Sequence, residues 1–278
     1  MLRVRPVLFA AGTFAIAAGC LACGGSPGGG ATSSPSSIAA PPGQNTTMCQ
    51  PYQTTTIDGG RYTLQDDEWG SSAAECVATS GGTDFTVTRS AIAKPAGGDP
   101  GSYPSLYAGC NFGACTKGGL TANPPVLGDL DPGDVTTSLA TTDPAGGAYD
   151  VSYDIWTNRE PTASGAPDGT EVMVWLNRHG GVQPAGSQVA SGVSIGGQAY
   201  DVWYSPNAGN GPCVTYVMTP ARSSVSGLDL TPLFADAAKR GYVQSSWYLI
   251  AVEAGFEIWQ GGTGLAVKSF SVALSNGA

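Results

Sequence analysis

Short runs of alternating apolar and polar residues recur through most of this chain, and turns rich in glycine and proline separate them. Alternation with a period of two is typical of β-strands that bury one face and open the other. With 41 glycines and 20 prolines among 278 residues, the chain suits many tight turns better than long helices. The runs predict strands over Arg61–Leu64, Glu75–Ala78, Asp84–Ala91, Ser105–Ala108, Val135–Ala140, Tyr149–Thr157, Glu171–Asn177, Ser187–Val193, Gln198–Tyr204, Val214–Thr219, Tyr248–Ile258 and Leu265–Leu274.

This many strands predict an all-β fold, a sandwich of two curved antiparallel sheets. One short α-helix is expected from Thr231 to Arg240, with Thr231 as its cap, Pro232 in its first position and Gly241 at its end. The chain is 41% hydrophobic and 12% charged. It can bury one substantial core but not two, so we expect a single domain over residues 49–278.

The N-terminal region has the pattern of an exported protein. Arg3 and Arg5 precede an apolar stretch over residues 6–18, which is too short to span a bilayer as a stable helix. Residues 1–23 are therefore predicted to be a secretory signal peptide. Residues 24–48, rich in Gly, Ser, Pro and Ala, are typical of a flexible tether.

A cysteine at the end of this leader suggests a membrane anchor. Ala17-Ala18-Gly19-Cys20 is similar to a bacterial lipobox, in which the cysteine is lipidated and becomes the new N-terminus. A lipidated Cys20 would place the domain on the outer face of the cell membrane. Because Ala17 stands where such motifs prefer Leu, free secretion stays open as the alternative.

Charge and histidine content exclude several classes of function. The chain has 12 basic and 21 acidic residues, and the leader holds two of the basic ones and none of the acidic ones. An acidic surface argues against nucleic acid and anionic membrane partners, whereas neutral glucans are indifferent to it. His179, the only histidine, precedes two glycines and is predicted to lie in a surface turn. One histidine excludes a multi-histidine metal cluster and a serine triad, and we expect no metal, no cofactor and a monomer.

Three acidic residues interrupt runs that otherwise read as buried strands. By alternation, Glu171 shares one strand face with Met173 and Trp175, and Asp154 shares one with Trp156. Glu257 likewise accompanies Trp259. Two carboxylates can divide nucleophile and acid/base duties on a glycosidic bond, and indole rings stack on sugar faces. These strands therefore predict a sugar-cleaving site.

The same stretches resemble glycoside hydrolase family 12, a family of β-jelly-roll endoglucanases and xyloglucanases with a retaining mechanism. The resemblance extends from about Cys49 to Leu274. It implies a jelly roll with a concave cleft and hydrolysis of β-1,4-glucosidic bonds within a glucan chain. The motifs that carry it are Gly169–Asn177, Glu253–Gly262, Tyr153-Asp154-Ile155-Trp156, Gln65–Gly70 and the loop Gly180–Ser187.

Roles follow from this resemblance residue by residue. Glu171 is expected to be the nucleophile, Glu257 the acid/base and Asp154 a contact of the nucleophile. Glu253 is the competitor of Glu257 if no bulge intervenes at Gly255. For a retaining enzyme the two catalytic carboxyl groups should lie about 5–5.5 Å apart.

The resemblance also assigns substrate contacts. Trp69 is expected to be the main sugar platform, and the 180–187 loop, which includes Pro184, crosses the cleft in relatives. Tryptophans of a sandwich are also frequent core residues, so each has that alternative. Three positions depart from the family pattern, since Asp66 and Asp67 replace usual amides and Phe112 replaces a frequent tryptophan. The remaining predicted contacts are Met173, Trp175, Trp203 and Trp259.

Seven cysteines agree with export. Sequence alone permits many pairings of the five that follow the leader region. By resemblance, Cys49 pairs with Cys76 and Cys110 with Cys115. Cys213 is then left as a buried thiol, because nothing near it in sequence suggests activation.

A different class of function also fits a jelly roll with an aromatic cleft, namely a non-catalytic carbohydrate-binding surface protein. Binding alone requires none of the three acids Asp154, Glu171 and Glu257, and their joint presence favours the enzyme. The preferred glucan depends on cleft width and loops, which the sequence does not specify.

Overall fold

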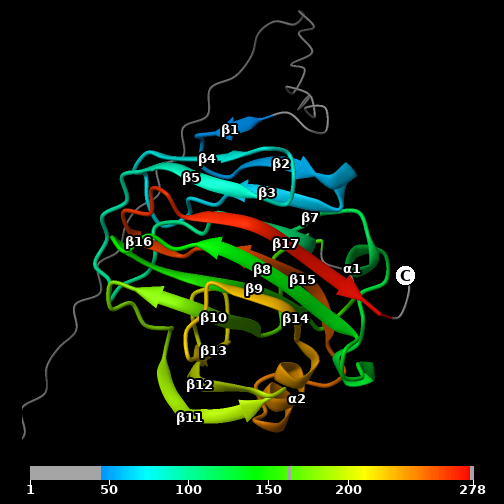
Figure 1. Cartoon of the computed structure of the whole chain (residues 1–278). Helices are drawn as coiled ribbons and strands as arrows, with labels where there is room; N and C mark the ends of the chain where they lie inside the picture. The colour runs from blue at the N-terminus through cyan, green and yellow to red at the C-terminus, as the bar shows by residue number, and fades with distance from the viewer. Residues whose placement is uncertain (1–44, 162–163, 276–278) are drawn as a thin grey trace, which may run out of the picture. The chain divides into compact units, whose positions relative to one another are not determined.

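The computed structural model describes residues 45–161 and 164–275, which form two β-sheets. The predicted signal peptide, Cys20 and all but the last residues of the predicted tether lie outside this range. The six-stranded sheet has the order β1 (Thr46–Met48), β4 (Glu75–Thr79), β5 (Phe85–Ser90), β17 (Ala266–Leu274), β8 (Val135–Thr142) and β14 (Ser224–Asp229). Figure 1 shows this sheet against the second one.

The second sheet has eleven strands, nine of them in one continuous path. Two short strands lie off the path: β16 (Ile258–Gln260) pairs with β9, and β7 (Ala114–Cys115) pairs with β6. The path runs β11 (Ser187–Ile195), β12 (Gln198–Ser205), β13 (Cys213–Thr219), β10 (Glu171–His179), β9 (Ala148–Asn158), β15 (Tyr248–Gly255), β6 (Ser105–Asn111), β3 (Tyr62–Asp66) and β2 (Gln53–Ile57).

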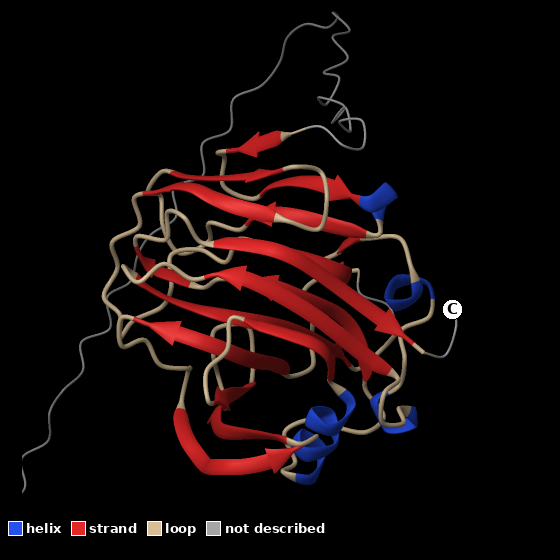
Figure 2. Cartoon of the chain, in the orientation of Figure 1, coloured by secondary structure: helices blue, strands red, loops and turns tan. Residues whose placement is uncertain are grey.

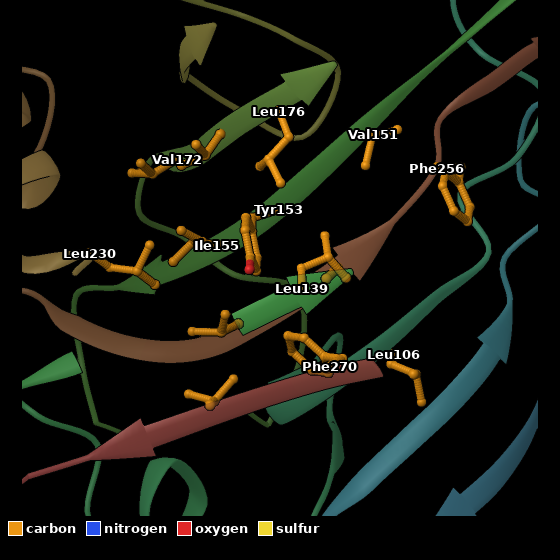
Figure 3. Close-up of a cluster of buried hydrophobic side chains, with 14 of the residues drawn as sticks. Leu106, Leu139, Val151, Tyr153, Ile155, Val172, Leu176, Leu230, Phe256 and Phe270 are labelled. Carbon is orange, nitrogen blue, oxygen red and sulfur yellow. The ribbon is translucent and has the colours of Figure 1, made fainter. Parts of the chain in front are cut away.

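Apolar side chains from the facing sides of both sheets form one core. Figure 3 shows part of this core, in which Tyr153 and Ile155 of β9 lie near Leu139 of β8 and Phe270 of β17. Each of these side chains is at most 2% exposed. Alternation along β9 explains the arrangement, because odd positions from Tyr149 to Ile155 enter the core and even positions face away from it. The all-β jelly-roll prediction is confirmed.

The pairing differs from the prediction at one place near the centre of the larger sheet. Strands β10 and β13 are parallel, with Glu171 opposite Cys213, whereas the other pairs are antiparallel. Parallel neighbours require a crossover connection, and here the β11–β12 hairpin lies between them in sequence. The prediction of purely antiparallel sheets was therefore wrong for this pair.

The helix content also differs slightly from the prediction, as Figure 2 shows. The expected helix is α2 (Thr231–Lys239), but a second helix of one turn, α1 (Gly119–Ala122), accompanies it, with the 3₁₀ turns η1 (Asp58–Gly60) and η2 (Leu127–Asp129). The cap of α2 is Leu230 rather than Thr231. Asp229 serves the helix start instead, because its Oδ1 accepts a hydrogen bond from the Thr231 N–H at 3.0 Å. No helix in the described residues is long and apolar enough to cross a membrane.

The predicted strand Tyr248–Ile258 is interrupted, and the break matters for the site. Strand β15 ends at Gly255, and β16 begins at Ile258. A Cβ atom at Gly255 would lie 2.1 Å from the carbonyl oxygen of Pro104, so only glycine permits this approach. Glu257 therefore lies in a two-residue gap between strands. The sequence prediction also missed β1, β2, β7 and β14, which are short or rich in polar residues.

Both predicted disulfides are present. Cys49 is bonded to Cys76 and links the end of β1 to β4, and Cys110 is bonded to Cys115 across a short hairpin. Cys213 is free and buried, as expected.

The Cys49–Cys76 bond closes a loop with a sequence separation of 27. Replacing both cysteines by serine should lower the free energy of unfolding by about 3 kcal/mol, because the unfolded chain gains freedom. Denaturant unfolding of the pair variant checks this value. The matched variant lacks Cys110 and Cys115, whose separation is 5, and should lose less. An equal or larger loss there would contradict the loop-length argument.

Candidate active site

The face of the larger sheet that points away from the core carries a cluster of acidic side chains. Strand β9 lies at its centre and presents Asp150, Ser152 and Asp154 on this face. In the ladder, Asp154 lies opposite Met173 of β10 on one side and opposite Glu253 of β15 on the other. Parity of the strand positions thus brings carboxyl groups from three neighbouring strands together.

Exposure separates these acids into two groups. Asp150, Asp154 and Glu253 are 0%, 6% and 1% exposed. Glu171 and Glu257 are only partly buried. A carboxyl group that reacts with a polymer must be reachable from outside, so Glu171 and Glu257 are the two members of the cluster fit for direct chemistry.

Glu171, the first residue of β10, has two hydrogen-bond partners in the cluster. Its carboxyl group interacts with the side chain of Asp154 and with the thiol of Cys213 on the parallel strand β13. Burial and the negative charge of Glu257 raise the pKa of Glu171 to about 8, and these two hydrogen bonds oppose the increase. Glu171 and Glu257 are therefore close enough that ionisation of one disfavours ionisation of the other.

Glu257 is held by Asp150. The Glu257 N–H donates to Asp150 Oδ1 at 3.1 Å, and the Asp150 N–H donates to the Glu257 carbonyl oxygen at 3.0 Å. Burial, followed by the charge of Asp150, keeps the pKa of the Glu257 side chain well above its usual value. The raised pKa favours the protonated form of Glu257, which a general acid requires.

Glu253, the competitor of Glu257, has a structural role. Its carboxylate accepts hydrogen bonds from Ser105 Oγ at 2.9 Å, Gln65 Nε2 at 3.1 Å and Trp156 Nε1 at 3.2 Å. Three donors and complete burial leave this group no access to a substrate. It fixes the indole of Trp156, which lies opposite Glu171 in the ladder.

The predicted aromatic contacts divide by exposure. Trp69, in the loop after β3, is 47% exposed and can offer a ring face to a sugar. Trp175 and Trp259 are 1% and 3% exposed and pack against each other edge to face, with ring centroids 6.3 Å apart. These two rings lie beneath the surface of the acid-bearing face, and their contact with sugar stays a prediction. Alternation in the sequence predicts which face of the sheet these two side chains occupy, but it does not predict how deeply they are buried.

The other predicted contacts are less exposed than Trp69. Met173 is 5% exposed and packs with Trp175, whereas Trp203 is half-buried at the edge of the same apolar cluster. Pro184 is buried within the loop that joins β10 to β11. His179 is the last residue of β10, and its ring stacks on Tyr149 while its Nδ1 lies 2.8 Å from the Gly147 carbonyl oxygen.

The structure adds residues that the sequence did not assign to the site. Asp150 has the same parity on β9 as Asp154, yet its contact with Glu257 depends on the break after Gly255. Cys213 was set aside as a buried thiol, and the parallel pairing of its strand brings it to Glu171. Phe112 is 47% exposed and packs edge to face on Trp156, with centroids 5.3 Å apart. The two acidic residues that depart from the family pattern differ in exposure. Asp66, at the end of β3, is fully buried, whereas the next residue, Asp67, is partly exposed.

Replacing Trp69 by alanine should raise the KM for a soluble glucan about tenfold with little change in kcat, because a stacking contact contributes about 1 kcal/mol or slightly more. Steady-state kinetics on a polymeric glucan measure both constants. The melting temperature should stay near that of the wild type, since the ring is half exposed. Trp259→Ala is the contrasting variant and should be destabilised instead, by about 3–5 kcal/mol. An unchanged KM in Trp69→Ala would contradict its role as a platform.

A two-sheet jelly roll whose open face carries two reachable carboxyl groups beside buried partners defines a glycoside hydrolase of the two-carboxylate kind. The comparison of sequences agrees, because the profile of Glycosyl hydrolase family 12 matches residues 60–275. The chain belongs to this family, whose members include endoglucanases and cellulases.

Known relatives share most of the described domain. A solved structure named endo-1,4-beta-glucanase CelB2, a cellulase, is 39% identical, with a TM-score of 0.76 over 83% of this chain and 100% of that one. Endoglucanase cel12A from Rhodothermus marinus is 36% identical, with a TM-score of 0.76 over 83% of this chain and 99% of that one. Probable cellulase Cel12b of Mycobacterium tuberculosis is 34% identical over 139 residues, which cover 50% of this chain and 89% of that protein.

Proposed function

We propose that this protein is an endo-acting β-1,4-glucanase that cleaves cellulose-type, mixed-linkage or xyloglucan chains with retention of configuration. The observation that carries the proposal is the pair Glu171 and Glu257, the two partly exposed carboxyl groups of an otherwise buried acidic cluster. Retention requires the carboxyl groups of Glu171 and Glu257 to lie about 5–5.5 Å apart, so that one can attack while the other delivers a proton.

In the first step, a carboxylate oxygen of Glu171 bonds to the anomeric carbon while the bond to the leaving sugar breaks. The proton of Glu257 goes to the leaving oxygen. In the second step, Glu257 takes a proton from water, the water oxygen bonds to the anomeric carbon, and the Glu171 carboxylate leaves. Asp154 and Cys213 donate or share hydrogen bonds that favour the ionised form of Glu171 before attack, and Glu257 does not oppose this ionisation while it holds its own proton. Formation of the ester removes the negative charge of Glu171, which lets Glu257 ionise.

Names of relatives support the substrate class. Besides the cellulases above, a xyloglucan-specific endo-beta-1,4-glucanase of Phytophthora sojae is 35% identical over 129 residues, although the chain spans about half of that protein's length. We propose secretion through the signal peptide, with either release or attachment through lipidated Cys20 to the outer face of the cell membrane. The two disulfides support an oxidising location.

The test is the stereochemistry of cleavage. Barley mixed-linkage glucan, carboxymethylcellulose and xyloglucan are incubated with the domain while early products are followed by proton NMR. Retention yields the β-anomer of the new reducing end first, before mutarotation. The α-anomer first would establish inversion and contradict the mechanism. Binding to all three polymers without product release would favour the non-catalytic carbohydrate-binding alternative.

A further inference from the structure

The side chain of Asp150 has an unusual partner. Its Oδ1 accepts two hydrogen bonds, from Ser152 Oγ at 2.8 Å and from the Glu257 N–H at 3.1 Å. Its Oδ2 is buried and receives no bond from any N–H or hydroxyl in the described residues. The side chains of Asp150 and Glu257 interact with each other, and Oδ2 is the Asp150 oxygen that no other donor occupies. Two carboxyl groups in contact require at least one proton between them.

No cation is placed to replace that proton. The one ion pair within the described residues joins Arg240 to Asp236. Arg178, opposite Asp150 in the ladder, is exposed and donates to the Val182 carbonyl oxygen. Lys94, in the loop after β5, donates to the carbonyl oxygens of Gly70 and Pro100.

The other titratable groups near the pair are all acids. Asp154 lies on the same strand, Glu171 on β10, Glu253 on β15, and the exposed Asp99 in the loop after β5. Tyr103 near Asp150 and Cys213 near Glu257 are neutral when protonated, so none of these neighbours brings a positive charge to the pair.

We propose that Asp150 is a positioning residue that makes the general acid a two-proton pair, so that the enzyme is active only while Asp150 and Glu257 are both protonated. This inference rests on the proposed role of Glu257. With a single proton, the Glu257 hydroxyl is used in the bond to Asp150 Oδ2 and is not directed at the substrate. With two protons, Asp150 donates to Glu257, and the Glu257 hydroxyl is free to donate to the glycosidic oxygen.

The second proton is the one that leaves first as pH rises. The hydrogen bonds from Ser152 and the Glu257 N–H stabilise an ionised Asp150, and so does a donated bond from Glu257. Burial raises the pKa of Asp150 to about 6, and these bonds limit the increase. Activity should therefore fall above about pH 6. During the reaction the Asp150 proton stays in place, donating to Glu257 while the latter loses and regains its own.

The test is the pH dependence of kcat/KM on barley mixed-linkage glucan for the whole domain and three variants. Asp150→Asn replaces the titrating hydroxyl by an amide N–H that donates at every pH. The basic limb of its profile, meaning the fall of kcat/KM as the pH rises, should therefore move up by about one pH unit. Ser152→Ala removes one donor to the ionised Asp150 and should move the limb in the same direction, by less. Asp99→Asn removes a nearby charge without touching the pair, and its limb should stay in place or move slightly down.

An unmoved or lowered basic limb in a folded Asp150→Asn would overturn the proposal, because Asp150 would then act only as a neighbouring charge. If Asp150→Asn does not fold, an unmoved limb in Ser152→Ala overturns it. The role of Glu257 is tested separately with Glu257→Ala, which should lose activity on the glucan. With an activated aryl β-glycoside, whose leaving group departs without a proton, the variant should form the glycosyl-enzyme and release a β-glycosyl azide when azide is added. If azide fails to rescue Glu257→Ala, the proposed function is contradicted. If azide rescues it but the basic limb of Asp150→Asn does not move, only the two-proton pair is contradicted.

Discussion

Replacing Glu171 by glutamine should lower kcat on soluble glucans on the order of 10⁵-fold, a loss of about 7 kcal/mol of transition-state stabilisation. The amide keeps the size of the side chain and its contacts with Asp154 and Cys213. It lacks the negative oxygen that forms the bond to the anomeric carbon. Reducing-end release beside the wild type measures the loss, and KM should change little because the same surfaces bind the glucan.

Two controls make this result specific. Glu160→Gln removes an exposed carboxyl group outside the cluster and should leave kcat within about twofold. Glu171→Ala should regain turnover when azide is supplied, and the product should be the α-glycosyl azide, since the small anion attacks in place of the carboxylate. Substantial residual activity of Glu171→Gln would move the nucleophile role to another acid.

The domain should become more stable as the pH falls from 8 to 4. Asp66 and Glu75 are 0% and 1% exposed. The carboxyl oxygens of Asp66 have no N–H or hydroxyl partner in the described structure, and those of Glu75 meet only the hydroxyl groups of Ser90 and Ser102, too far or too poorly aligned for a good hydrogen bond. Their side chains face each other, and Glu68 adds a third carboxyl group. A proton on one of them supplies the missing hydrogen bond.

The direction follows from proton linkage. Burial raises the pKa of Asp66 to about 7 from an ordinary value of 3.8, and that of Glu75 to about 7 from 4.5. The folded protein thus holds protons that the unfolded chain releases near pH 4. The stabilisation is fully present below about pH 4 and is lost as the pH rises through about 7. Because one pH unit of difference corresponds to about 1.4 kcal/mol, and the two groups are not independent, a loss of about 5 kcal/mol is expected.

Thermal unfolding measures this effect, and a drop in melting temperature of about 10–20 °C between pH 4 and pH 8 is expected. Asp66→Asn should flatten the dependence, because an amide can donate to Glu75 at any pH. Asp131→Asn, an exposed substitution of the same kind, should leave the curve unchanged. A melting temperature that rises from pH 4 to pH 8 would contradict the cluster's role.

Alternation along strands predicted most of the fold and the face on which the acids gather. Tyr153 and Ile155 could be assigned to the core and Asp154 to the opposite side from residue parity alone, since parity is a property of the backbone. The contact of Asp150 with Glu257 could not be predicted in this way, because it depends on the gap between β15 and β16. At the edge of that gap Gly255 lies against Pro104, a contact between segments distant in sequence.

The sequence also did not predict how deeply a side chain is buried or which strands lie next to each other. Parity places Trp175 and Trp259 on the acid-bearing side but does not say whether loops cover them, so both were predicted to touch sugar. Likewise, no local pattern indicates that β13 lies parallel to β10. Cys213 therefore gave no sign of its position beside Glu171. Family resemblance supplied the disulfide pairs, which spacing alone left open.

The contact between Trp175 and Trp259 has a mechanical and optical consequence. Trp175 lies four residues after Glu171 on β10, and Trp259, on β16, lies two residues after Glu257, so the indole contact links the two segments that carry the proposed reacting groups. A double displacement needs the same spacing in both steps, while the attacking group becomes an ester and then a carboxylate again. The fluorescence of two indoles packed edge to face responds to small changes in their separation. Tryptophan fluorescence should therefore follow the distance between these two segments during turnover without any added label.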